Sequence, residues 1–206
     1  MGLVRPPCYV VGYMFNDEGT EVALILKDHP PEQAGLLNGI GGKVNLLEDN
    51  QMAMLREFQE ETGVTAMDMV TKATELWQHT IYLQGTTWEV HYFRAFSSPI
   101  IEELKVKRDW PTNEPVIVVP TRSLPGNLYN HVEWTLAISI APGVKFPFRV
   151  DDTTPPVYED GEILVCPWNC GWYDTEMANL DACPKCQGSF ASRKPFSWKT
   201  ARRNDD

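Results

Sequence analysis

Three glutamates, Glu57, Glu60 and Glu61, lie three and four residues apart in this 206-residue chain. If the segment is helical, their carboxylates point to one side of the helix, one turn above another. Like charges stacked in this way repel one another, and a bound cation offsets the cost. An all-oxygen site suits Mg²⁺ or Mn²⁺. The spacing therefore predicts a site for one of these ions, and the plain alternative is a solvated acidic helix face.

The same segment has the features of an amphipathic helix. Its apolar residues fall on a different side from the glutamates and form a stripe to bury: Leu55, Phe58 and either Met52 or Met54. Asp49 or Asn50 can cap the helix start, and Gly63 stands where a helix end favours a left-handed residue. We expect a helix from about Asn50 to Thr62.

The glutamates belong to a longer pattern that begins at Gly42 and ends at Val64. Five residues separate Gly42 from Glu48, and seven separate Glu48 from the stretch Arg56 to Val64. This pattern resembles the Nudix box of the Nudix hydrolase family, Gly-x5-Glu-x7-Arg-Glu-U-x-Glu-Glu-x-Gly-U with U a bulky apolar residue, at every specified position. A solvated acidic face does not require the glycines and the arginine, so the pattern favours the metal site.

The resemblance implies roles for the residues of the box. The implied metal ligands are Glu57 and Glu61, with Glu60 as a further one and the backbone carbonyl of Gly41 completing the shell. Arg56 is implied to be structural, held between Glu48 and the glutamates. Metal ions on a diphosphate neutralise its oxygens and lower the pKa of a water molecule, so that water attacks phosphorus at neutral pH.

The resemblance leaves the catalytic base open. In some family members the base is the glutamate that matches Glu57, and in others it is a carboxylate on a distal loop. Glu114 is our candidate for that loop carboxylate or for an extra metal ligand, and Glu102 and Glu103 are its rivals. The alternative for each is a solvated loop glutamate.

A second stretch, Leu37 to Val44, bears on the substrate. It resembles a segment of the oxidised-purine nucleotide hydrolases of the family, in which the asparagine contacts the base. Asn38 is therefore a candidate base-reading residue, with Gly42 and Lys43 as further substrate-binding candidates, although Asn before Gly is also common in turns. The resemblance has a departure: that group has a pair of aspartates shortly before a tryptophan, and none precedes Trp134 here.

Short apolar, β-branched runs surround the expected helix and predict strands. We expect two hairpins, a further strand and an apolar helix: Cys8 to Phe15 with Glu21 to Leu26, Gln78 to Phe96 with a turn at Gln84 to Thr86, Val116 to Val119, and Val132 to Ile140. Strands on both sides of one helix predict an α/β fold, a Nudix α/β/α sandwich with a mixed sheet over residues 1–141.

The C-terminal part of the chain predicts a second unit. A Pro-rich linker over residues 142–160 precedes a segment, residues 161–206, with two cysteine hooks: Cys166 and Cys170, then Cys183 and Cys186. Each hook resembles a knuckle of a zinc ribbon, and four thiolates at such spacing can bind a structural Zn²⁺ ion. The first hook has three intervening residues rather than two, and disulfides are the alternative. The fifth cysteine, Cys8, is expected to be a small buried residue.

Composition limits the partners. The formal net charge of −10 argues against broad nucleic-acid binding. The tail from Ala191 to Asp206 interleaves basic and aromatic residues, which keeps nucleic acid open as a partner. The net charge does not favour it. No apolar run approaches the length of a membrane span and no N-terminal signal is evident, so a cytoplasmic protein is expected.

These observations predict a metal-dependent pyrophosphohydrolase that acts on a nucleoside triphosphate or another nucleoside diphosphate derivative. Two alternatives stay open. One is a hydrolase of dinucleotides or capped RNA ends guided by the zinc ribbon, and the other is a nucleotide-sensing module without catalysis. The substrate and the oligomeric state do not follow from the sequence.

Overall fold

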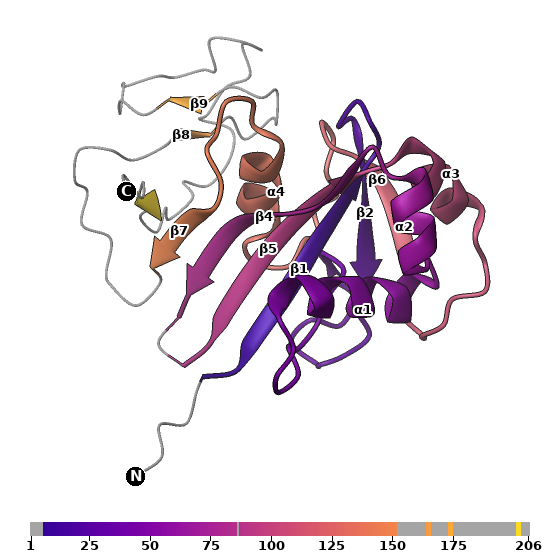
Figure 1. Cartoon of the computed structure of the whole chain (residues 1–206), viewed down its shortest axis with the longest axis horizontal. Coiled ribbons are helices and arrows are strands. Elements are labelled where there is room, and N and C mark those ends of the chain that lie inside the picture. The colour runs from indigo at the N-terminus through magenta and orange to yellow at the C-terminus, as the bar shows by residue number, and fades with distance from the viewer. Residues whose placement is uncertain (1–5, 86, 152–163, 166–172, 175–200, 203–206) are drawn as a thin grey trace.

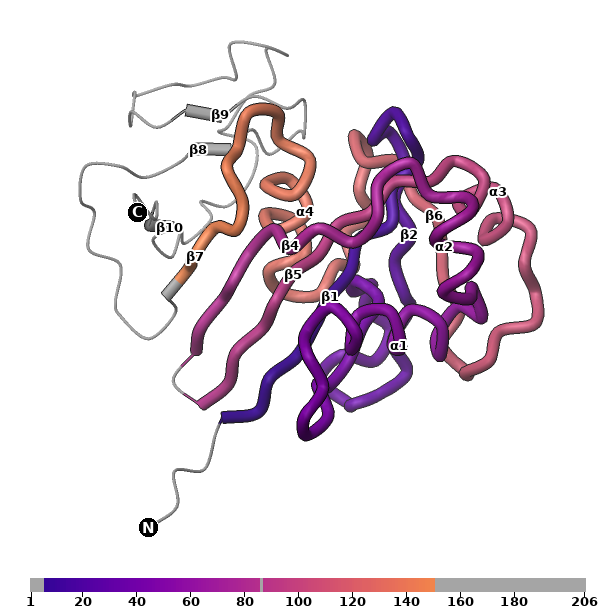
Figure 2. Tube along the Cα trace, in the orientation of Figure 1, coloured from indigo at the N-terminus to yellow at the C-terminus, as the bar shows by residue number. Residues whose placement is uncertain are grey.

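The structure is a computed structural model that describes residues 6–85, 87–151, 164–165, 173–174 and 201–202 (Figures 1 and 2). Its centre is an eight-stranded mixed sheet of order β10-β7-β4-β5-β1-β2-β3, in which β6 also pairs with β2. The strands of this sheet are β1 Cys8–Phe15, β2 Glu21–Leu26, β3 Leu37–Asn38, β4 Glu75–Gln84, β5 Glu89–Phe96, β6 Val116–Pro120, β7 Phe148–Asp151 and β10 Ala201–Arg202. The described helices are α1 Asn50–Thr62, α2 Ala66–Lys72, α3 Ser98–Val106 and α4 Val132–Ile140. Strands β8 Leu164–Val165 and β9 Tyr173–Asp174 pair with each other.

The pairing of the strands confirms the predicted hairpins and the mixed sheet. Strands β1 and β2 are antiparallel, as are β4 and β5. The β4 strand begins at Glu75 rather than at the predicted Gln78. Strand β1 lies parallel to β5, and β4 lies parallel to β7.

Helices cover both faces of the sheet and make two separate cores. Along β1, Val10 and Met14 pack into one core, which also holds buried side chains of α1, α2 and α3. Tyr13 and Phe15, which point to the opposite face because side chains alternate along a strand, pack into the second core with α4. The sheet is therefore the middle layer between helices, as the sequence predicted.

Helix α1 begins and ends where its sequence signals predict. The Asp49 side chain accepts hydrogen bonds from the backbone N–H groups of Gln51 and Met52, each at 2.9 Å. Gly63 closes the helix in the left-handed conformation, with φ 75°. Of the two methionines offered for the apolar stripe, Met54 is the buried one. This places the stripe on the sheet and leaves the glutamate side to face the loop that precedes the helix.

Helices α2 and α3 and strand β7 are among the elements that were not predicted. Helix α2 begins with a capping box between Thr65 and Asp68, and α3 begins at a Ser97 cap. Strand β7 lies within the expected linker, so part of residues 142–160 pairs with the sheet. Cys8 is buried in β1, as expected.

The predicted zinc ligands Cys166, Cys170, Cys183 and Cys186 lie outside the described residues. The zinc ribbon and the division of the chain into a domain, a linker and a ribbon therefore stay predictions. None of the helices among the described residues is long and apolar enough to cross a membrane.

Candidate active site

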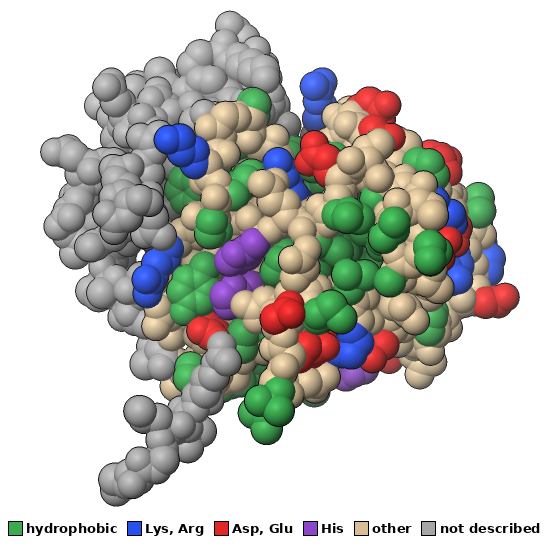
Figure 3. Space-filling view, in the orientation of Figure 1, with side chains coloured by type: hydrophobic (Ala, Val, Ile, Leu, Met, Phe, Trp, Pro, Cys, Tyr) green, Lys and Arg blue, Asp and Glu red, His purple; other side chains and the backbone are tan. Residues whose placement is uncertain are grey.

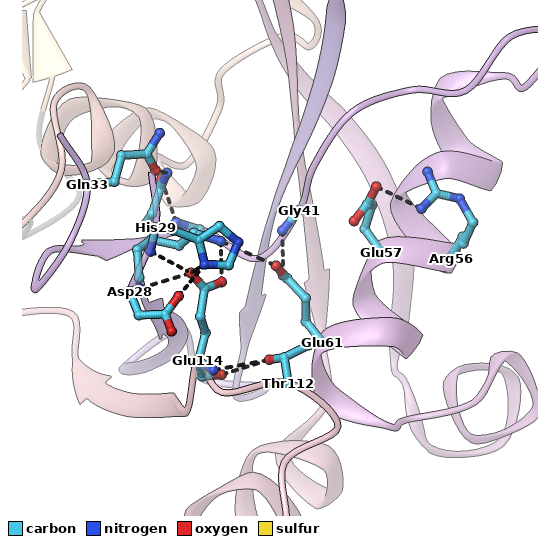
Figure 4. Close-up of polar contacts among 12 residues, drawn as sticks. Asp28, His29, Gln33, Gly41, Arg56, Glu57, Glu61, Thr112 and Glu114 are labelled. Carbon is cyan, nitrogen blue, oxygen red and sulfur yellow. Dashed lines mark hydrogen bonds and ion pairs between the residues drawn. The ribbon is translucent and has the colours of Figure 1, made fainter. Parts of the chain in front are cut away.

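The loop that follows β3 contains Gly39, Gly41 and Gly42 and is called the glycine loop. Two of the three predicted ligands, Glu57 and Glu61, face this loop. The Gly41 N–H donates a hydrogen bond of 2.9 Å to Glu61 Oε2 (Figure 4). Glu57 lies against Gly42, since a Cβ atom added there would come within 2.6 Å of Glu57 Oε2. The Glu60 side chain is 57% exposed. The helix therefore presents two sheltered carboxylates to the loop and a third at the rim.

The glycine loop is held against β1 by backbone hydrogen bonds on either side of Gly41. The carbonyls of Ile40 and Gly42 accept from the N–H groups of Gly12 and Val10, at 2.7 Å and 2.9 Å. Among the residues that the structure describes, the Gly41 carbonyl accepts no hydrogen bond. A Cβ on Gly41, whose φ is 153°, would lie 2.1 Å from the Val10 oxygen. Only glycine fits here, and its carbonyl can act as a ligand.

Arg56 joins Glu48, Glu57 and Glu60 into one hydrogen-bonded network. Its guanidinium donates to both oxygens of Glu48, at 2.9 Å and 3.0 Å, and to Glu57 Oε1 at 2.7 Å. It also reaches Glu60 Oε2 and the backbone oxygen of Lys43, each at 3.0 Å. The hydrogen bond to Glu48 is the main reason why the pKa of Arg56 is raised, and the same bond lowers the pKa of Glu48. Such a fork fixes the direction of the Glu57 carboxylate.

Glu114, the candidate loop carboxylate, is buried beside Glu61 and is joined to it by a lysine. Lys27 Nζ forms an ion pair with Glu114 Oε2 and lies 3.6 Å from Glu61 Oε1. The backbone N–H of Asp28 donates to Glu114 Oε1 at 2.9 Å, and His29 lies on the same carboxylate (Figure 4). The structure thus brings Glu114 to the site.

The rivals Glu102 and Glu103 lie on α3 and make other contacts. Glu102 pairs with Lys105 at 2.7 Å, and Glu103 pairs with Lys72 at 2.8 Å. Both are exposed carboxylates of surface ion pairs, which suits the solvated alternative that the sequence allowed.

Lys27 is a residue of the site that sequence reasoning missed. It directly follows Leu26, the last residue of β2. The Leu26 N–H donates a hydrogen bond of 2.9 Å to the Pro115 oxygen. Because β2 pairs with β6, the chain after β2 and the chain before β6 meet at one end of the sheet. Lys27 belongs to no motif, and only this pairing brings it to Glu114.

Burial changes the acidity of the two sheltered glutamates. Desolvation is the largest cause of the shift for both, and it raises the pKa of Glu61 to about 7. The Lys27 charge and the Gly41 N–H act in the opposite direction on Glu61. One buried and one partly buried carboxylate beside a backbone carbonyl are a donor set that fits Mg²⁺ or Mn²⁺, whose charge would compensate for their desolvation.

The substrate-binding candidates lie next to this site. Asn38 accepts a hydrogen bond from the Gly39 N–H at 2.8 Å and donates to Gln33 Oε1 at 3.2 Å. The first contact is the turn role that the sequence left open, and base contact stays a prediction. On α4, Trp134 Nε1 donates to His131 Nδ1 at 3.2 Å.

Comparison with known proteins gives a family match. The family model described as NUDIX domain matches residues 6–127. No curated protein sequence matches the chain. Solved structures with similarity include a MutT NUDIX hydrolase from Burkholderia pseudomallei, at 20% identity and a TM-score of 0.45 over 65% of this chain and 97% of that one. An ADP-ribose pyrophosphatase from Streptococcus suis has 13% identity and a TM-score of 0.48 over 72% of this chain and 100% of that one.

Proposed function

The chain belongs to the Nudix hydrolase family, and on that premise we propose that it is a metal-dependent pyrophosphohydrolase of nucleotide-type substrates. The observation that carries the proposal is the pair Glu57 and Glu61. Both carboxylates are sheltered, they face the same glycine loop, and burial raises the pKa of each. An arrangement that costs free energy without a cation is suited to binding one.

Each residue of the site has a proposed task. Glu57, Glu61 and the Gly41 carbonyl hold the ion, with Glu60 as a further ligand from the rim. Arg56 and Glu48 keep Glu57 pointed at the loop. When bound, the ion neutralises phosphate oxygens and favours ionisation of the attacking water. Lys27 lies close enough to the carboxylates to stabilise negative charge that develops beside them.

We assign the catalytic base to Glu57 rather than to Glu114. The oxygens of Glu114 are engaged by Lys27 and by the backbone N–H groups of Asp28 and His29. These contacts make Glu114 a positioning residue for Lys27 and the loop after β2. Burial raises the pKa of Glu57, which makes its carboxylate a better proton acceptor.

The proposed substrate is a nucleoside triphosphate or another nucleoside diphosphate derivative, cleaved by attack of water at phosphorus. The stretch from Leu37 to Val44 supports a purine nucleotide through its resemblance to the oxidised-purine hydrolases. The lack of aspartates before Trp134 weighs against a copy of that specificity. The C-terminal cysteines, which lie outside the described residues, are proposed to bind a structural Zn²⁺ ion.

A panel of nucleoside triphosphates, dinucleotides and capped RNA, each with Mg²⁺ or Mn²⁺, tests the proposal. We expect a nucleoside monophosphate and pyrophosphate from at least one triphosphate, and loss of about a thousandfold or more in kcat for Glu57→Gln and Glu61→Gln. Glu114→Gln should retain part of the activity. Glu18→Gln, in the exposed turn between β1 and β2, is the matched control. Metal-dependent turnover that survives in both Glu57→Gln and Glu61→Gln would overturn the proposed site.

A further inference from the structure

A second group of candidate ligands lies on the same face of the sheet as α1, at the N-terminal end of that helix. Ligand atoms of Cys8, Glu89 and His91 all lie within 4.8 Å of one another. The parallel register of β1 and β5 explains the grouping, because it aligns Cys8 with Glu89 and Val10 with His91. Residues two apart on a strand share a face, and Figure 3 shows neighbouring histidine side chains at the surface of this face.

Neighbouring side chains hold this cluster, which consists of Cys8, Glu89 and His91. The Nδ1 atom of His91 lies 3.1 Å from Nε2 of His79. Tyr82 donates a hydrogen bond of 3.0 Å to Glu89 Oε2. Metal-binding histidines and carboxylates usually have such partners, which fix the orientation of the ligand and the tautomer of the ring.

We propose that Cys8, Glu89 and His91 bind a transition-metal ion of the zinc type. A thiolate, an imidazole and a carboxylate are ligands that Zn²⁺ accepts, whereas Mg²⁺ and Mn²⁺ favour oxygen alone. In the bound state, Nε2 of His91 contacts the ion, and its Nδ1–H donates a hydrogen bond to Nε2 of His79. His79 then takes the tautomer with its proton on Nδ1 and gives up its contact with the Ile81 carbonyl. The Cys8 thiol loses its proton to solvent, and water completes the shell.

The distances require only a small rearrangement. Ligand atoms around a tetrahedral Zn²⁺ ion lie roughly 3.5 Å apart. Atoms that lie within 4.8 Å of one another therefore need to approach by no more than about 1.3 Å. The pairing of β1 with β5 already places the backbones of the three residues side by side. Rotation of the side chains therefore supplies the remaining movement.

The cluster is distinct from the candidate active site. Cys8 Sγ lies 3.6 Å from Oδ1 of Asn50, the first residue of α1. Glu57 follows seven residues later, which is roughly 10 Å along a helix axis. An ion at the cluster would join the first residue of β1 to β5. We therefore assign it a structural role: it clamps the N-terminal edge of the Nudix domain.

Alkylation of the full-length protein, mapped by mass spectrometry, tests the site. The chain has five cysteines, and peptide mapping follows Cys8 separately from the four in the C-terminal hooks. In protein stripped of metal, added Zn²⁺ should slow alkylation of Cys8 by about tenfold or more, because a metal-bound thiolate is shielded. Mg²⁺ should leave the rate unchanged.

Three variants and a control make the result specific. The ratio of the Cys8 alkylation rate without Zn²⁺ to the rate with Zn²⁺ should fall to about one in His91→Ala and close to it in Glu89→Gln, whereas His131→Gln, at the N-cap of α4, should keep the wild-type ratio. Cys8→Ser should lose one bound Zn²⁺ per chain with the circular dichroism spectrum unchanged. No protection of Cys8 in the wild type, or full protection in His91→Ala, overturns the proposal. Catalytic activity does not enter this readout.

Discussion

Gly42 lies so close to Glu57 that a Cβ atom on residue 42 would come within 2.6 Å of Glu57 Oε2. The glycine that opens the box is therefore required by the carboxylate that it faces. We expect Gly42→Ala to turn Glu57 away from the loop and to weaken Mn²⁺ binding and kcat by about 10- to 100-fold. Mn²⁺ titration followed by electron paramagnetic resonance measures the first effect. Gly126→Ala, at a glycine with open space around it, is the control. Wild-type Mn²⁺ affinity in Gly42→Ala would show that Glu57 is not held by this contact.

Replacing Arg56 by lysine tests whether its geometry matters beyond its charge. The guanidinium contacts both oxygens of Glu48 and reaches Glu57 in the same plane of donors. Lysine keeps the charge but cannot make these contacts together. We expect Arg56→Lys to lower kcat by about 10- to 100-fold with a smaller change in KM. Equal activity of Arg56→Lys and the wild type would reduce the role of Arg56 to its charge.

The helix of the site could be predicted from sequence because its signals are local. Asp49 caps the first turn and Gly63 ends the last, and both lie within a few residues of the backbone groups that they serve. The missed helix α2 had a signal of the same kind, since Thr65 and Asp68 form a capping box. Local chemistry thus accounts for the α1 helix and its glutamates.

The rest of the site depends on contacts between distant parts of the chain. Lys27 and Glu114 are 87 residues apart, and they meet because β2 and β6 are neighbours in the sheet. The resemblance singled out Glu114, but no spacing in the sequence points to its partner. The raised pKa of Glu61 is equally a product of burial. Strand pairing and burial, which have no short sequence signature, determine these properties.

The charge of Lys27 should set the pH at which the site accepts metal. Lys27 Nζ lies 3.6 Å from Glu61 Oε1 and lowers the pKa of Glu61. A charge at this distance is worth about 1 kcal/mol even at the dielectric constant of water, which corresponds to roughly 0.8 pH unit. In Lys27→Met, the pH midpoint of Mn²⁺ binding should rise by about that amount. Lys43→Met is the control for loss of a positive charge near the loop. A midpoint that does not move contradicts the proposed coupling.

Glu61 should also make the stability of the metal-free protein depend on pH. Its pKa is about 7 in the folded protein, against an ordinary value of 4.5. Because the folded state binds this proton more tightly, its contribution to the free energy of unfolding is complete below about pH 4.5 and is lost as the pH rises through 7. The loss is up to about 3 kcal/mol.

Urea unfolding at pH 5 and pH 8, without metal, measures this effect. The free energy of unfolding should fall more between these pH values in the wild type than in Glu61→Gln, which has no carboxyl to ionise. Added Mg²⁺ should restore the stability of the wild type at pH 8 and have little effect on Glu61→Gln. Parallel pH profiles of the two proteins would show that Glu61 does not titrate as its burial implies.

Asn38 can act in the turn alone or can also contact the base of the substrate. A comparison of purine and pyrimidine nucleotides distinguishes these two roles. Its side-chain oxygen accepts the Gly39 N–H at 2.8 Å, so Asn38→Ala removes a turn contact whatever the substrate. If the contact acts only on the loop, kcat/KM should fall by one common factor for purine and pyrimidine nucleotides. If Asn38 also reads the base, kcat/KM should fall further for purines, by about 10-fold for one lost hydrogen bond. We expect the second result, because the resemblance to the oxidised-purine hydrolases implies a base contact, and the bond to Gln33 at 3.2 Å leaves the second N–H of the Asn38 amide for it. A common factor for both nucleotide classes would limit Asn38 to its turn.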